Sequence, residues 1–239
     1  MGNIVYGKNP VEAAVNANHV KTLYVAERLK SDSFALHLTS QGVKTKYVSD
    51  AELERLAQTK FTQGYVAEVN EYRLYSLSEL INDAKTKQYP LIAMLDGIED
   101  PHNLGAILRS ADAFGVDGVI IKKRGQVSLN PTVAKVSTGA IEYVKVCEVA
   151  NLSQAIKTLK DNGYWVVATD GSATQNYDDI DYKSPICVII GSEGFGISQL
   201  VLRNSDFIVK IPMYGHVNSL NASNAACTLF AQIDHNRRH

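Results

Sequence analysis

Cysteine is scarce in this sequence, which has three in 239 residues: Cys147, Cys187 and Cys227. Each lies 40 residues from the next, and no Cys-x-x-Cys pair or mixed Cys/His cluster accompanies them. An odd number of isolated cysteines excludes a disulfide framework, and their spacing excludes the usual zinc sites. We therefore expect three buried free thiols and no metal.

Long apolar runs are also missing. No stretch approaches the roughly 20 apolar residues that span a bilayer. The first residues, MGNIVYGKNPVEAA, lack the basic-then-apolar layout of a signal peptide, and Tyr6 stands where a myristoylation motif has Ser or Thr. With 45% hydrophobic and 21% charged residues, the chain has the composition of a globular protein. We expect a cytoplasmic protein with no membrane partner.

The sequence has no surplus of charge of either sign, because its formal net charge is −1. Bulk electrostatics therefore does not indicate a nucleic-acid partner. A local patch suffices for phosphate contact, however, and Lys122-Lys123-Arg124 is the densest basic cluster before the C-terminal tail. A solvated strand end is the alternative interpretation of this cluster.

Short strands and helices alternate along residues 1–75, which predicts a small α/β domain. Asp50 before AELERL, with Glu52 and Glu54 in the first turn, is a typical helix start. The segment GYVAEVNEYRLY (64–75) is expected to close this domain as one long strand. A polar stretch, residues 76–90, is expected to form a short helix and a linker that ends at Pro90.

Residues 91–239 form the second predicted domain. Apolar strands such as PICVIIG and YWVVATDG indicate a sheet buried on both faces and therefore mostly parallel, as in an α/β fold. Helices are expected between the strands, at residues 103–115, 130–142, 151–163 and 198–204. Because ligands bind at the carboxyl ends of such strands, three unusual loops there are candidate sites: DGIEDPHNLGA, GSEGFGIS and PMYGHVNSLNAS.

The first loop leads into a helix that carries Arg109. Asn103 lies where it can cap that helix, and a purely structural role is a strong alternative for it. Arg109 stands in the small and apolar sequence GAILRSADAFG, where a guanidinium needs a partner such as a phosphate.

The second loop, GSEGFG, resembles a phosphate-binding glycine loop without matching one. Gly196 is followed by Ile197-Ser198, so the P-loop Lys is missing, and the GxxGxG spacing differs from the GxGxxG dinucleotide fingerprint. The glycines of this loop allow its backbone to approach a ligand closely. Glu193 places a carboxylate at the mouth of the candidate site.

The third loop offers four small polar residues before the last helix: Ser219, Asn221, Ser223 and Asn224. A helix cap needs only one such residue, so the three additional polar residues favour a binding surface. Tight packing against another segment explains the alanines that lie between these polar residues equally well. No Ser-His-Asp or Cys-His pair is evident. The site is therefore expected to position its substrates for group transfer from a reactive donor.

Together the three loops resemble, in order and spacing, the three motifs of the SpoU/TrmH family. These are RNA ribose 2′-O-methyltransferases of the SPOUT class. The likeness covers residues 91–239 densely, and the first 75 residues resemble the family's substrate-binding domain, which is similar to RNA-binding ribosomal proteins. The arrangement is most similar to the branch of the bacterial 23S rRNA guanosine 2′-O-methyltransferase.

The resemblance implies a C-terminal trefoil knot, S-adenosylmethionine as cofactor and a homodimer in which one subunit could supply Arg109 to the other. It assigns the methyl-transfer site to Arg109, Asn103, Glu193, Ser219 and Asn221. It assigns cofactor binding to Gly191, Ile211, Leu220, Met213 and Gly194. Two positions depart from the family pattern: Ala222 and Asn224 stand where Val is common, and Asn224 adds an amide near the cofactor.

The implied activity is methylation of a ribose 2′-hydroxyl in RNA, most simply a guanosine of large-subunit rRNA. A tRNA substrate of the same family is one alternative. A non-catalytic RNA-binding factor for ribosome assembly is another, but a degenerate relative is expected to have lost some of the five transfer-site residues.

Overall fold

The computed structural model describes residues 3–239 and divides into two compact units. Unit 1 contains the residues up to Tyr72 together with Leu129–Tyr143, and unit 2 contains Arg73–Ser128 and Val144–His239. The units are therefore not contiguous segments, because a piece from the middle of the chain belongs with its beginning. Among residues 3–239, no helix combines the length and apolarity that crossing a membrane requires.

Unit 1 is built on a four-stranded sheet in the order β1-β4-β2-β3. The strands are β1 Asn3–Tyr6, β2 Val20–Ala26, β3 Thr45–Val48 and β4 Tyr65–Val69. β2 and β3 are parallel, whereas β4 runs antiparallel to both β1 and β2. The helical segments are α1 Lys8–Asn16, η1 Glu27–Leu29, α2 Ser33–Ser40, α3 Asp50–Ala57, α6 Pro131–Val136 and η2 Ala140–Glu142. The expected small N-terminal α/β domain is confirmed.

Unit 2 is built on a seven-stranded sheet in the order β7-β6-β5-β10-β8-β11-β9. Its strands are β5 Leu91–Asp96, β6 Gly118–Lys122, β7 Val146–Val149, β8 Trp165–Thr169, β9 Gln175–Asn176, β10 Ile186–Gly191 and β11 Phe207–Lys210. All of their pairings are parallel, which confirms the expected α/β class. The helical segments are α4 Leu77–Ala84, α5 Pro101–Ala113, α7 Leu152–Asp161, η3 Tyr177–Asp179, α8 Gln199–Asn204 and α9 Ala222–Arg238.

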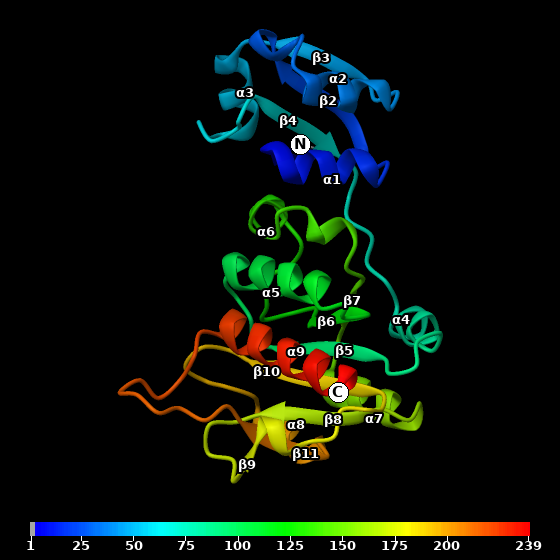
Figure 1. Ribbon diagram of the computed structural model, residues 1–239, viewed down its shortest axis with the longest axis vertical. Helices are drawn as coiled ribbons and strands as arrows, with labels where there is room; N and C mark the ends of the chain where they lie inside the picture. The colour runs from blue at the N-terminus through cyan, green and yellow to red at the C-terminus, as the bar shows by residue number, and fades with distance from the viewer. Residues whose placement is uncertain (1–2) are drawn as a thin grey trace. The chain divides into compact units, whose positions relative to one another are not determined.

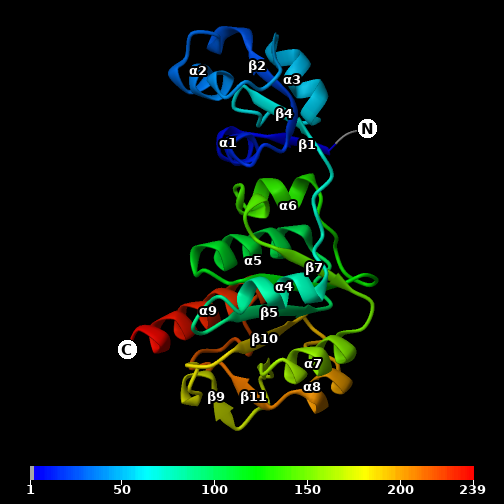
Figure 2. The same cartoon turned by 90° about the vertical axis from the view of Figure 1, so that its right-hand side faces the viewer.

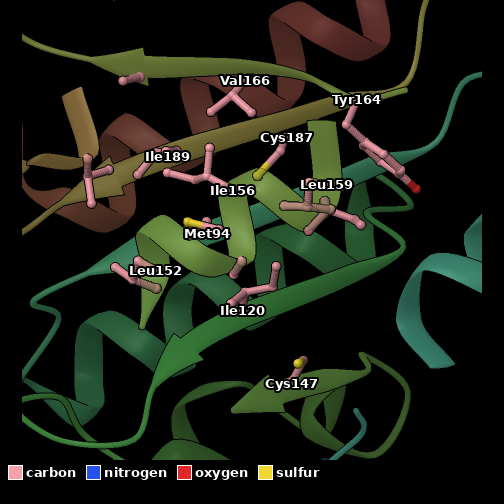
Figure 3. Close-up of a cluster of buried hydrophobic side chains, with 14 of the residues drawn as sticks. Met94, Ile120, Cys147, Leu152, Ile156, Leu159, Tyr164, Val166, Cys187 and Ile189 are labelled. Carbon is pink, nitrogen blue, oxygen red and sulfur yellow. The ribbon is translucent and has the colours of Figure 1, made fainter. Parts of the chain in front are cut away.

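The two faces of this sheet are covered by different helices, α5 and α9 on one side and α7 and α8 on the other (Figures 1 and 2). Alternate side chains of each strand serve the two faces. Met94, Cys187 and Ile189 enter the cluster beneath α7 and α8 (Figure 3). Leu80 and Ile81 of α4, within the expected linker, join the same cluster. Central strands buried on both faces explain the near-continuous apolar runs in the sequence.

Two expected elements differ from the structure. The predicted strand 64–75 ends at Val69, and Tyr75 instead forms an isolated bridge to Cys147 of β7, in unit 2. The predicted helix 130–142 is broken into α6 and η2, because Thr138 and Gly139 adopt φ values of 52° and 100°. A left-handed backbone conformation at two successive residues ends a right-handed helix.

Candidate functional site

The carboxyl ends of three neighbouring strands, β10, β8 and β11, surround a pocket in unit 2. It encloses a cavity of about 170 Å³ that opens to solvent. Its walls combine apolar strand-end side chains with polar loop residues. They comprise Thr169, Asp170, Gly171, Ile190, Gly191, Ser192, Glu193, Gly196, Val209, Lys210, Ile211, Met213, Asn218, Ser219, Leu220, Ala222 and Ala225.

Most of the cofactor residues suggested by the sequence line this pocket. Gly191, Ile211, Met213 and Leu220 are among its walls, whereas Gly194 is not. Of the residues suggested for methyl transfer, Glu193 and Ser219 line it as well. The second and third sequence loops therefore form two sides of one pocket.

The loop after β10 is a tight closed turn. The backbone N–H of Ser192 donates to Gly196 O at 3.1 Å, and the N–H of Gly196 donates to Ser192 O at 3.0 Å. A Cβ atom on Gly191 would lie 2.3 Å from the carbonyl carbon of Gly196. Glycine is therefore required at position 191 so that the two sides of the turn can approach each other.

A hydrogen-bonded triad joins all three sequence loops at the edge of this pocket. The side chain of Asn103 donates from Nδ2 to Glu193 Oε1 at 3.0 Å. Asn221 Nδ2 donates to Asn103 Oδ1 at 2.9 Å and also to Glu193 Oε1. Two amides thus share one carboxylate oxygen, which fixes the orientation of all three side chains.

The helices that carry the two amides begin differently. α5 begins at Pro101 and is capped by Asp100, whose carboxylate accepts from His102 N at 2.8 Å. That hydrogen bond, followed by one from the His102 side chain, lowers the pKa of Asp100. The capping role considered for Asn103 is therefore wrong, and its amide is free for the triad. Asn221 both caps α9, accepting from Ser223 N at 2.9 Å, and belongs to the triad.

Asp96 fixes the second loop to the end of β5. Its buried carboxylate accepts from Ser198 N at 2.9 Å, across 102 positions of sequence. Asp96 pairs in register with Gly191, so the first two loops leave the sheet side by side.

Arg109 is not brought into the pocket by its own chain. It is exposed on α5 and has no hydrogen-bond or ion-pair partner among residues 3–239. It lies six positions after Asn103 on the helix, which turns it about 120° away from Asn103 and the triad. Glu193 therefore holds the two amides and not the guanidinium.

Ser219 lines the pocket, but its Oγ donates only to the neighbouring Asn218 Oδ1, at 3.4 Å. Its hydroxyl is exposed and available to a bound molecule. Within the described part of the chain, no group of three or more His, Cys, Asp or Glu residues could hold a metal ion.

The end of β8 is a wall of the pocket that sequence reasoning missed. Thr169 donates from Oγ1 to Ile189 O at 3.0 Å, and Asp170 N donates to Val209 O at 2.9 Å. These bonds hold the turn TDG against the two neighbouring strands. The sequence did carry a signal, because polar residues directly follow the buried strand residues VVA (166–168), at the carboxyl end of the strand.

Comparison with known proteins gives one consistent result. Residues 90–230 match the SpoU rRNA Methylase family, and residues 4–75 match the family described as RNA 2′-O ribose methyltransferase substrate binding. A TrmH family tRNA/rRNA methyltransferase of Staphylococcus epidermidis is 41% identical over 99% of this chain and 96% of its own.

Solved structures agree in fold. A crystal structure of an RNA 2′-O ribose methyltransferase is 26% identical with a TM-score of 0.81, over 99% of this chain and 89% of its own. The SpoU methyltransferase AviRb of Streptomyces viridochromogenes, in complex with AdoMet, is 24% identical with a TM-score of 0.82, over 98% of this chain and 90% of its own.

Proposed function

The chain belongs to the SpoU rRNA methylase family, and from this premise we propose that it transfers a methyl group from S-adenosylmethionine to a ribose 2′-hydroxyl of RNA. The target proposed first is a guanosine of large-subunit rRNA. One observation carries the proposal: residues from three distant loops meet at a single pocket and are fixed there by the Asn103–Glu193–Asn221 triad.

The residues of the pocket fit S-adenosylmethionine. Ile190, Val209 and Ile211 supply an apolar wall for a flat base, and the closed turn after Gly191 exposes backbone to a ligand. Polar groups at Asp170, Ser219 and Glu193 suit the ribose and amino-acid parts. Gly191, Ile211 and Leu220 hold the cofactor through their backbone groups in this proposal, and Met213 and Gly194 complete its surroundings.

When bound, S-adenosylmethionine supplies an electrophilic methyl group. The chain must then position a ribose hydroxyl and ease the loss of its proton. We assign to Arg109 the binding of a phosphate beside that ribose, with the phosphate accepting the proton, since Arg stays protonated. Asn103, Ser219 and Asn221 orient the ribose, and Glu193 fixes the two amides. The need for a 2′-hydroxyl restricts the substrate to RNA.

The position of Arg109 supports a homodimer. Its guanidinium is exposed, unpaired among the described residues and outside the pocket of its own chain. We infer that Arg109 reaches the pocket of a partner subunit. After β11 the chain passes back to the first two loops, where Asn221 donates hydrogen bonds to Asn103 and Glu193. This path of the chain supports the inferred trefoil knot.

Unit 1 is proposed to hold the RNA. The ends of β1, β2 and β4 lie side by side, since Gly7 N donates to Tyr65 O and Ala26 N donates to Gly64 O. Exposed lysines gather in the segments at this end: Lys8, Lys30 and Lys60. Beside them Phe61 is 77% exposed, which suits stacking on an unpaired base.

The decisive experiment is transfer of labelled methyl from S-adenosylmethionine to separate pools of unmodified rRNA and tRNA, with the product mapped. Label at one ribose of large-subunit rRNA is the expected result. Label in tRNA would keep the reaction and replace the target. If the protein binds S-adenosylmethionine but labels neither pool, the proposed methyltransferase activity is contradicted and a non-catalytic role in ribosome assembly is favoured.

A further inference from the structure

The basic cluster Lys122-Lys123-Arg124, hereafter the basic turn, plays no part in the pocket or the triad. It begins at Lys122, the last residue of β6, at the carboxyl edge of the unit 2 sheet. All three side chains are exposed, and none has a hydrogen bond or an ion pair with another residue of the chain between positions 3 and 239. Three adjacent cations without a partner, in a chain whose net charge is −1, form a strong local positive charge.

The basic turn is held in place by its backbone. Lys122 N donates to Gln126 Oε1 at 2.7 Å, and Gln126 Nε2 in turn donates to Leu95 O. Lys123 N donates to Val149 O at 2.9 Å, and Val127 N donates to Ile98 O at 2.9 Å. The turn is thereby tied to β7 on one side and to the first sequence loop on the other. Its side chains project from a fixed base, as a preorganised site requires.

The register of the sheet brings the basic turn close to the proposed methyl-transfer site. Ile120 pairs with Met94 on β5, and Asp96 pairs with Gly191 on β10. Lys122, Asp96 and Gly191 therefore lie level across three adjacent strands, and the backbones of the outer two are about 10 Å apart. A lysine or arginine side chain covers much of that distance.

We propose that the basic turn binds backbone phosphates of the RNA strand that enters the pocket, close to the methylated nucleotide. This inference rests on the proposed function, because it takes RNA as the substrate. Phosphate contacts fix the register of a nucleic acid without reading its bases. The basic turn therefore acts in positioning the substrate, while target choice depends on other contacts.

The test compares two triple variants that remove the same charge. Lys122→Ala/Lys123→Ala/Arg124→Ala neutralises the basic turn. Lys157→Ala/Lys183→Ala/Arg203→Ala neutralises three exposed cations elsewhere in unit 2, of which Lys183 and Arg203 precede strands at the opposite edge of the sheet. For both proteins the dissociation constant for an unmodified rRNA fragment is measured across a range of salt concentrations. Thermal melting and S-adenosylmethionine binding are measured beside it.

The basic-turn variant is expected to bind the RNA at least about tenfold more weakly at low salt, with a salt slope smaller by about 2, since each lost phosphate contact contributes about 0.7–0.9. Its KM for RNA rises, while S-adenosylmethionine binding and melting stay unchanged. An unchanged slope, or an equal loss in the control variant, overturns the inference. If the basic-turn variant melts early, Lys123→Ala alone is expected to lower the slope by somewhat less than 1.

The two proposals fail in different ways. If the wild-type protein transfers no methyl group to RNA, the proposed function fails. If it does transfer one and the basic-turn variant behaves like the control, only the role of the basic turn is rejected.

Discussion

Asn221 and Asn103 lie 118 positions apart in the sequence, and their side-chain amides are joined by a hydrogen bond of 2.9 Å. The bond connects the first residue before α9 with the first turn of α5, and both amides also donate to Glu193. Three loops that leave three different strands are thus fixed to one another at a single point.

Asn221→Ala removes both the cap of α9 and the amide of the triad. We expect the free energy of unfolding to fall by about 1 kcal/mol, the usual cost of a lost N-cap. Methyl transfer should fall more steeply, by about 100-fold, because a misplaced positioning group is costly in catalysis. Urea unfolding and single-turnover methyl transfer measure the two effects.

Asn221→Ser separates these roles. Serine caps a helix about as well as asparagine, so stability should stay close to that of the wild type, while the donor to Asn103 and Glu193 is lost. The serine variant should therefore be stable and slow. Wild-type methyl transfer by this variant would show that the triad amide is not needed.

Gly191→Ala should abolish cofactor binding. The added Cβ would lie 2.3 Å from the carbonyl carbon of Gly196 and 2.6 Å from Ile197 N, so the turn must open. Gly215→Ala, in the third loop, is the matched control because its Cβ would meet no atom within 4 Å. Calorimetric titration with S-adenosylmethionine should show binding for the Gly215 variant alone, and equal affinity for both would contradict the role of the turn.

Arg109→Ala should leave cofactor binding intact and reduce methyl transfer by about 100- to 1,000-fold, as loss of a charge-stabilising group does. Mixing this variant with Gly191→Ala tests whether the arginine acts across a dimer. After subunit exchange, heterodimers would pair one intact pocket with one intact Arg109 only if the arginine acts in trans.

An equal mixture should then recover about a quarter of the wild-type activity, because half of the dimers are mixed and each has one complete site. A mixture that exchanges subunits and stays inactive would show that Arg109 serves its own chain.

Phe61→Ala should weaken RNA binding by about 5- to 100-fold, the range for one lost base stack. Because Phe61 is 77% exposed, thermal stability should change little. Leu36, 51% exposed on α2 of the same unit, provides the control variant Leu36→Ala. Equal RNA affinities of the two variants, measured by fluorescence anisotropy, would count against a stacking role.

Thiol reactivity should distinguish the three cysteines. Burial raises the pKa of Cys147 to about 11, raises that of Cys187 further and leaves both protonated at pH 8, whereas Cys227 is only half-buried. A disulfide reagent at pH 8 should therefore modify Cys227 alone in the folded protein and all three thiols after denaturation. Modification of Cys147 as fast as Cys227 would contradict this burial.

The same shift predicts an alkaline loss of stability. The folded pKa of Cys147 is about 11, against an ordinary value of 9.0. Its contribution to stability is therefore complete below pH 9 and is lost as the pH rises toward 11, since the unfolded thiol ionises first. Urea unfolding should show the decline, and Cys147→Ala should make it shallower.

Local elements followed from local sequence where no long-range contact opposed them. The apolar strands lie where the pattern places them. The helix expected to start after Asp50 is capped one residue earlier, by Ser49. The last helix begins at Ala222, so Ser223 and Asn224, which were expected before it, lie in its first turn. Prediction failed where the chain passes from one unit to the other. Residues 64–75 have a uniformly strand-like composition, but the strand ends at Val69, three residues before Tyr72, where the first segment of unit 1 ends.

Part of the candidate site could also be foreseen. Glycine spacing and small polar residues indicated the loops after β10 and β11, because close backbone approach limits the residue types that fit. The turn after β8 went unnoticed, since Thr-Asp-Gly is an ordinary strand end until two neighbouring strands place it beside the other loops.

By itself the sequence determined the elements, the parallel sheet and the three loops that carry polar residues, because periodicity and backbone preferences act over a few residues. Only the tertiary structure decided that Asn103, Glu193 and Asn221 share hydrogen bonds and that Arg109 does not line the pocket of its own chain. These relations depend on strand order and on helix rotation, and both are fixed by packing between residues about 100 positions apart.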